Sequence, residues 1–171
     1  MSAKKRIDRN LVSLIDMLAS EDGATRLKAR KLLVAIGKPA VAPLRRSLQE
    51  SEVDHVRWEA VKALGGIGDP GAIPPLVKAL QDRDPDVRWL AAEALRKFKR
   101  VAWPPLLRAL IRGGPDSVLL RETAHHVLRN QKENGYNDVL ATLTKALVSS
   151  SAPISTKVAA YDFLRRIQSK Q

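Results

Sequence analysis

The chain has 171 residues, of which 44% are hydrophobic and 4% are aromatic. This length suits one domain, and this hydrophobic content excludes a disordered chain. The sequence contains no cysteine, which excludes disulfides, thiolate metal sites and cysteine nucleophiles. Asp16 interrupts the short apolar stretch that follows the basic N-terminus, so we expect neither a signal peptide nor a transmembrane helix. We therefore predict a cytoplasmic protein without membrane contact.

The chain is strongly basic, with a net charge of +12 and an isoelectric point near 10.4. The excess lies toward the two ends: residues 1–37 carry eight basic and four acidic groups, whereas residues 38–68 and 69–99 are nearly balanced. Such a charge is typical of proteins that bind polyanions. It is equally typical of a solvated surface that keeps a protein soluble, and both interpretations stay open at this point.

Two kinds of segment alternate along the chain and predict two kinds of helix. The first kind, which we call the A helices, recurs at residues 40–48, 72–80 and 102–110, with Ala, Pro and two Leu at equivalent positions. The second kind, the B helices, recurs at residues 56–64 and 87–95, which both begin Val-Arg-Trp and end Ala-Leu. Self-similarity with a period near 31 residues is the signature of a stacked repeat fold.

Weaker copies extend the alternation in both directions. Residues 10–18 and 25–33 form a preceding pair, residues 120–128 complete the fourth pair, and residues 139–147 and 156–164 form a divergent fifth pair. We therefore predict one all-α domain over residues 1–171, a right-handed solenoid of about five antiparallel helix pairs. The expected repeats cover about residues 8–37, 38–68, 69–98, 99–133 and 134–171.

Helix-boundary residues agree with this division. Asp69 and Asp84 each precede a proline and are expected to cap a helix N-terminus. Gly37 and Gly68 follow apolar runs and are expected to end helices. Equivalent prolines inside the A helices, at residues 43, 75 and 105, predict a repeated bend.

The stretch from Leu64 to Leu76, with Gly-Gly-Ile-Gly-Asp-Pro at its centre, resembles the HEAT-like repeat of the phycobilisome-lyase type, as does Asp-Pro-Asp-Val-Arg at residues 84–88. The resemblance is specific over about residues 24–110, and Lys99-Arg100 departs from it where the repeat has Gly-Asp. It implies that the A helices form the outer wall and the B helices the concave wall. Scaffolds, bilin lyase subunits and DNA-repair proteins all use this repeat, so the fold does not fix the function.

One basic position recurs in every B helix. The series consists of Arg26, Arg57, Arg88, Arg121 and Lys157. A row of this kind suits phosphate binding, but the resemblance implies that each side chain bonds a carboxylate or carbonyl of its own turn. Asp22 and Asp84, four residues before an arginine, are the expected acidic partners. We do not include this row in the predicted site.

The opposite side of each B helix predicts the binding surface. At about 100° per residue, the side away from the buried Val56, Ala60 and Leu64 carries Trp58 and Lys62. The same rule applied to all five B helices yields the predicted site: Arg30, Trp58, Lys62, Trp89, Arg96, His125, His126, Arg129, Tyr161 and Arg165. Aromatic side chains interleaved with arginines suit a platform for a peptide or for bases. The alternative is that Trp58 and Trp89 pack between neighbouring B helices and cover the seams.

The remaining chemistry is sparse. Trp103, beside two prolines of an A helix, is expected in the core. His125 and His126 point about 100° apart on a helix and lack a complementary carboxylate set, so we predict no metal site. The sequence contains neither a nucleophile elbow nor a phosphate-binding glycine loop. These features favour a protein without a catalytic centre or cofactor.

We therefore predict a monomeric, non-catalytic scaffold that docks a protein or peptide on its concave B-helix wall. The first alternative is a nucleic-acid-binding protein related to the HEAT-like DNA glycosylases. The second, which rests on the resemblance alone, is a subunit of a bilin lyase or a chaperone.

Overall fold

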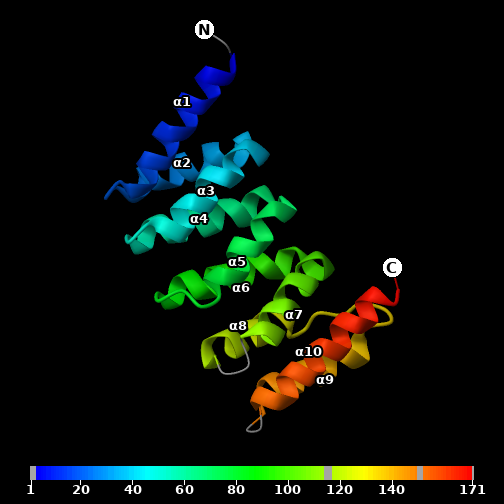
Figure 1. Cartoon of the computed structure of the whole chain (residues 1–171). Helices are drawn as coiled ribbons and strands as arrows, with labels where there is room; N and C mark the ends of the chain where they lie inside the picture. The colour runs from blue at the N-terminus through cyan, green and yellow to red at the C-terminus, as the bar shows by residue number, and fades with distance from the viewer. Residues whose placement is uncertain (1–2, 114–116, 150–151, 171) are drawn as a thin grey trace.

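The computed structural model describes residues 3–113, 117–149 and 152–170, which form α-helices and 3-10 helices and contain no strand. The helices up to residue 128 stack one after another from the N-terminus, and the last two lie side by side at the other end of the molecule (Figure 1). The α-helices are α1 (Ala3–Asp16), α2 (Gly23–Ile36), α3 (Val41–Glu50), α4 (Asp54–Ile67), α5 (Ile73–Ala79), α6 (Pro85–Lys97), α7 (Trp103–Arg112), α8 (Val118–Leu128), α9 (Asn137–Leu147) and α10 (Ala152–Gln168). The 3-10 helices are η1 (Met17–Ala19), η2 (Lys38–Ala40), η3 (Pro70–Ala72) and η4 (Lys99–Ala102).

The first eight α-helices form two layers. The A helices α1, α3, α5 and α7 pack side by side in one layer, and the B helices α2, α4, α6 and α8 pack side by side in the other. Leucines from both layers, such as Leu44 and Leu76 of the A helices and Leu64 and Leu95 of the B helices, are fully buried between them. The predicted all-α solenoid of helix pairs is confirmed.

The boundary residues behave largely as expected. The carboxylate of Asp84 accepts hydrogen bonds from the first free amides of α6, and Asp69 does the same for η3. Gly37 and Gly68 end α2 and α4 with positive φ angles of 74° and 69°. Lys99 stands at the equivalent place after α6 with a φ of 49°, a conformation that a side chain disfavours.

The predicted bend within the A helices is wrong. Each of these α-helices begins only two residues before its proline, with Pro43, Pro75 and Pro105 in the first turns of α3, α5 and α7. Amides in a first turn have no acceptor within the helix, so a proline there removes no helical hydrogen bond. The prolines mark where a 3-10 segment gives way to the α-helix.

Two neighbouring glycines bring the B helices close together. A Cβ atom at Gly65 of α4 would lie 2.8 Å from the Cβ atom of Ala94 on α6. A Cβ atom at Gly66 would lie 3.0 Å from a methyl group of Val34 on α2. Helix α4 therefore approaches both neighbours through positions that carry only hydrogen.

The last helix pair exchanges its layers. Helix α10, which the sequence places in the B layer, packs against α7 of the A layer and against α9, while α9 packs against α8 (Figure 1). The link from α8 to α9 runs from Arg129 to Tyr136 and contains positive φ angles at Asn130 and Gly135. This longer link carries the chain out of the regular stack before α9 begins.

An aromatic cluster holds the exchanged pair in place. The ring of Phe163 on α10 lies 5.2 Å from the ring of Trp103 on α7 and 6.1 Å from the ring of Tyr136. Trp103 is 1% exposed, and its indole nitrogen donates to the side-chain oxygen of Gln131 at 2.9 Å. The expectation that Trp103 is a core residue is confirmed, and its partners show that it is the anchor for the fifth pair.

Candidate binding surface on the B helices

The solvent-facing side of α2, α4, α6 and α8, which we call the B face, carries most of the predicted site. Its members are Arg30, Trp58, Lys62, Trp89, Arg96, His125, His126 and Arg129. Helix α6 contributes Trp89, Glu93 and Arg96 at spacings of four and three residues, which places them on one side of the helix. Trp89 is 56% exposed, whereas Trp58 is only partly exposed and packs against the core.

A buried carboxylate joins α2 to α4 beneath this surface. Glu59 is 7% exposed, and one of its oxygens accepts from the Arg30 guanidinium at 2.6 Å. The other oxygen lies 3.8 Å from the ammonium of Lys62. Because a buried carboxylate needs a charged partner, Arg30 is committed to Glu59, while the Lys62 side chain stays 37% exposed. Arg30 thus contributes less to the surface than its position in the sequence suggests.

A second carboxylate joins α6 to α8. Glu93 accepts from Arg96 at 2.9 Å and lies 2.5 Å from Nε2 of His126. Partial burial favours a raised pKa for Glu93, but the hydrogen bonds from His126 and Arg96 outweigh it, and the pKa lies below its usual value. The imidazole of His126 also lies beside Trp89, with 6.3 Å between the ring centroids. Trp89, Glu93 and His126 therefore form one cluster across the two helices, with Trp89 exposed and the other two partly buried.

A shallow groove of about 270 Å³ runs beside this cluster between α4 and α6. It is lined by the small or apolar residues Val61, Gly65, Leu90 and Ala94, with the basic Lys62 and Lys97 among its polar residues. Within the described part of the chain Lys97 forms no ion pair. The groove therefore combines an apolar surface with positive charge and an aromatic side chain one turn away.

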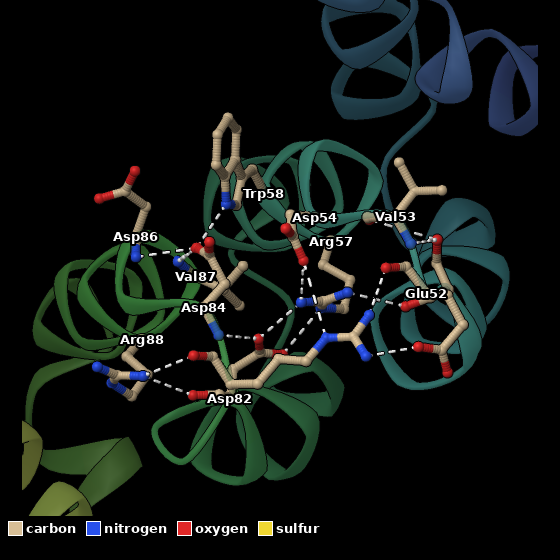
Figure 2. A network of polar contacts seen from close by, with 12 residues as sticks. Glu52, Val53, Asp54, Arg57, Trp58, Asp82, Asp84, Asp86, Val87 and Arg88 are labelled. Carbon is tan, nitrogen blue, oxygen red and sulfur yellow. Dashed lines mark hydrogen bonds and ion pairs between the residues drawn. The ribbon is translucent and has the colours of Figure 1, made fainter.

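Trp58 has a different environment, which Figure 2 shows. Its indole nitrogen donates to Oδ1 of Asp84, the residue that caps α6, at 2.8 Å. Burial alone would raise the pKa of Asp84, but the hydrogen bonds from the Trp58 indole and the amides of Val87 and Asp86 lower it. Trp58 therefore packs at the seam between α4 and α6, as the seam-packing alternative has it. Trp89 is largely exposed, and its role in a binding platform stays a prediction.

Arg57 lies at the centre of the same network (Figure 2) and is 3% exposed. Its guanidinium makes two parallel bonds to Asp82, of 3.0 and 2.9 Å, and further bonds to Asp54 at 2.6 Å and to the carbonyl of Ser51 at 3.0 Å. Asp82 belongs to the following repeat and also accepts from the amide of Asp84. A single buried cation thus links the second repeat to the third.

Two other members of the basic row bond the carbonyl groups of their own loops. Arg26 donates to the carbonyls of Ser20 and Glu21, and Arg88 donates to those of Asp82 and Arg83. The implied structural role of the row is confirmed for Arg26, Arg57 and Arg88. The predicted acidic partners are wrong, because Asp22 and Asp84 cap their helices and the arginines reach carbonyl groups instead.

The chain is similar to known repeat proteins in sequence and in fold. A family model for HEAT repeats matches residues 11–96 and 50–128, which together span more than half of the chain. The chain belongs to the HEAT repeat family. Among solved structures it is similar to a designed armadillo repeat protein, YIII(Dq.V1)4CPAF in complex with the peptide (KR)4. The two are 20% identical, the match covers 93% of this chain and 92% of that chain, and the TM-score is 0.38. No curated protein matches the chain significantly.

Two predicted site residues of this HEAT repeat protein lie elsewhere. Tyr161, which is 59% exposed, and Arg165 are on α10 and therefore belong to the exchanged pair. Their expected place at the end of the B row is wrong because α10 packs against α7 and not in the B layer. His125 does lie on α8 and is half-buried, and the exposed Arg129 directly follows the last residue of that helix.

Sequence reasoning missed Glu59 and Lys97. The angular rule places Glu59 toward the preceding repeat, where a charged residue has no obvious partner until Arg30 is known to reach across. Lys97 lies at the end of α6, about 280° around the helix from Val87, and so falls outside the side that the rule selects. A search for oppositely charged residues one repeat apart on facing sides of neighbouring B helices would have found the Arg30–Glu59 pair.

Two further findings concern metal ligands and membrane-spanning helices. Among the residues that the structure describes, no three His, Cys, Asp or Glu side chains are grouped as metal ligands. None of the described helices is long and apolar enough to cross a membrane.

Proposed function

We propose that this HEAT repeat protein is a docking scaffold whose B face binds an extended segment of a partner protein. The observation that carries the proposal is the exposed indole of Trp89, one helical turn from Glu93, which lines the groove. The same groove has an apolar lining and two exposed lysines, Lys62 and Lys97. An exposed tryptophan costs solubility, and tryptophans next to basic side chains are frequent anchors in protein interfaces.

The charges of the B face indicate the chemistry of the partner. The carboxylates of Glu59 and Glu93 already occupy Arg30 and Arg96. Lys62 and Lys97 remain to attract negative charge at the groove. We therefore propose a segment with an apolar side chain that packs on Trp89 and an acidic side chain that lies between the two lysines. A nucleic acid is less suited to this face because Glu59 and Glu93 neutralise its two central arginines, Arg30 and Arg96.

The test uses a displayed library of random peptides, selected on the wild-type protein and measured afterwards by fluorescence anisotropy. We expect enrichment of peptides that contain Asp or Glu near a large apolar residue. Trp89→Ala should weaken their binding about tenfold or more, as for an interface anchor. Lys97→Gln should weaken binding of the acidic peptides and leave binding of their amidated Asn or Gln versions unchanged.

The matched control is Tyr161→Ala, which removes an equally exposed aromatic side chain from α10, outside the B layer. It should leave peptide binding within about twofold of the wild type. Equal losses for Trp89→Ala and Tyr161→Ala, or the absence of any selected peptide, would contradict a B-face docking site.

A further inference from the structure

The positive charge of the central repeats lies in the A layer. Helices α3, α5 and α7 together contain five basic residues and one acidic residue, Glu50. The neighbouring B helices α4, α6 and α8 are longer in total, yet they contain six basic and five acidic residues. The excess charge is therefore concentrated on the side of the molecule away from the B face.

Three of these basic residues lie in a row across neighbouring A helices. Arg46, Lys78 and Arg108 occupy the same position in α3, α5 and α7, each midway between two fully buried leucines four residues apart. Midway between such residues the side chain points away from the core. All three are exposed, and α3, α5 and α7 pack side by side. Successive cations are thus separated by one helix-to-helix spacing, about 8–10 Å.

These cations lack acidic partners. In the ranges that the structure covers, none of Arg46, Lys78 and Arg108 forms an ion pair, in contrast to Arg30 and Arg96 of the B face. We call the exposed side of α3, α5 and α7 that carries these three residues the A face. Unpaired charges of one sign in a row create a field that attracts a polyanion.

We propose that the A face binds the phosphate backbone of a double-stranded nucleic acid without reading its sequence. Charge complementarity supports a polyanion as the ligand. A duplex fits better than an acidic protein or a single strand because these helices expose neither hydrophobic anchors nor aromatic side chains. Within the described residues, α3, α5 and α7 expose no large hydrophobic side chain, which a protein interface would use as an anchor. Their aromatic residue, Trp103, is buried, so these helices present no platform on which single-stranded bases stack.

The test is the salt dependence of binding to a labelled random-sequence DNA duplex, followed by fluorescence anisotropy. Each phosphate contact contributes about −0.9 to the slope of log K against log salt concentration. The triple variant Arg46→Gln, Lys78→Gln, Arg108→Gln should make that slope shallower by about 2–3 and weaken binding at low salt at least about tenfold. Circular dichroism and thermal melting check that the variant is folded.

A charge-matched variant distinguishes loss of the A-face residues from loss of net charge alone. Lys28→Gln, Lys38→Gln, Lys157→Gln removes the same three charges from exposed positions outside α3, α5 and α7. It should change duplex binding less than about threefold, since these residues make no phosphate contact in the proposal. Equal losses for both triple variants, or a flat salt response of the wild type, would overturn the A-face site.

Two further arms identify the polyanion. Polyglutamate that competes as well as duplex of equal charge would point to an acidic protein tract, and tighter binding of single-stranded DNA would point to contacts with bases; either result overturns the proposal. The A-face variant should retain binding of the peptides selected on the B face. The duplex site and the peptide site can therefore fail separately.

Discussion

Two neighbouring seams of the B layer, between α4 and α6 and between α6 and α8, can be compared directly. The same three residues stand at both seams, but the residues of the following repeat differ. Val-Arg-Trp lies in the first turns of both α4 and α6. At the first seam, Arg57 and Trp58 reach Asp82 and Asp84 of the next repeat. At the second seam the corresponding cap is Ser117, whose hydroxyl accepts from the amide of Leu120. Arg57 and Trp58 are therefore held by the loop of the following repeat, whereas the helix cap at the second seam is a hydroxyl and not a carboxylate.

The largest expected difference concerns the two arginines. Arg57→Met should destabilise the protein by about 3–5 kcal/mol, because it leaves the half-buried Asp82 without its cation. Arg88→Met should cost about 1–2 kcal/mol, because Arg88 bonds carbonyl groups of a single loop at a partly exposed position. Urea denaturation followed by circular dichroism measures both. Similar losses would mean that the link from Arg57 to the next repeat contributes nothing to stability.

The two tryptophans should differ in the same direction. Trp58→Phe removes the indole donor to Asp84 and should cost about 1–2 kcal/mol. Trp89→Phe keeps an exposed ring without such a bond and should change stability by less than about 0.5 kcal/mol. Thermal melting of the two variants checks this order, and a larger loss for Trp89→Phe would contradict it.

The tryptophan–carboxylate bond of the first seam can be introduced at the second seam. Ser117→Asp retains a good N-cap and places a carboxylate where Asp84 stands in the preceding repeat, so we expect a bond to the Trp89 indole and a gain of about 0.5–1 kcal/mol. Acrylamide quenching in a Trp58→Phe background should show a less accessible Trp89. Unchanged quenching would indicate that the backbone at this seam, and not the cap residue, keeps Trp89 exposed.

The smallest expected effect is a pH dependence of stability that arises from His125 at the second seam. Burial, assisted by the charges of Arg129 and His126, lowers the pKa of His125 on α8. The neutral imidazole then stabilises the fold above the unfolded-state pKa, about 6.5, and this contribution is lost as the pH falls through the lower folded-state value. Melting temperature should fall between pH 7.5 and 5.5, less steeply in His125→Gln. An unchanged pH dependence in that variant would exclude His125 as its source.

Much of the architecture follows from the sequence alone. Buried leucines at fixed spacing, Asp84 as a cap, and Gly37 and Gly68 as helix ends all depend on local geometry, which a repeat pattern reveals. Trp103 could be assigned to the core because it lies next to prolines in an A helix. Local patterns predict local structure well because their partners lie within the same turn or the same pair.

The features that the sequence did not reveal depend on partners in another repeat. Trp58 and Trp89 have the same place on their helices, so the angular rule cannot distinguish them. The exchange of α9 and α10 depends on the length of the link from Arg129 to Tyr136 and on the fit of Phe163 against Trp103. The position of Tyr161 and Arg165 could not be predicted without that fit.

The contact of α10 with α7 also determines how the molecule should come apart. In a regular solenoid each repeat contacts only its neighbours, and stability is a sum of nearest-neighbour terms. Here the fourth and fifth pairs share one aromatic cluster, and the first three share the carboxylate links of Glu59 and Asp82. We expect two cooperative unfolding units that meet between α6 and α8, where the link is the partly exposed contact of Glu93 with His126. Amide hydrogen exchange should sort their protected amides into two groups.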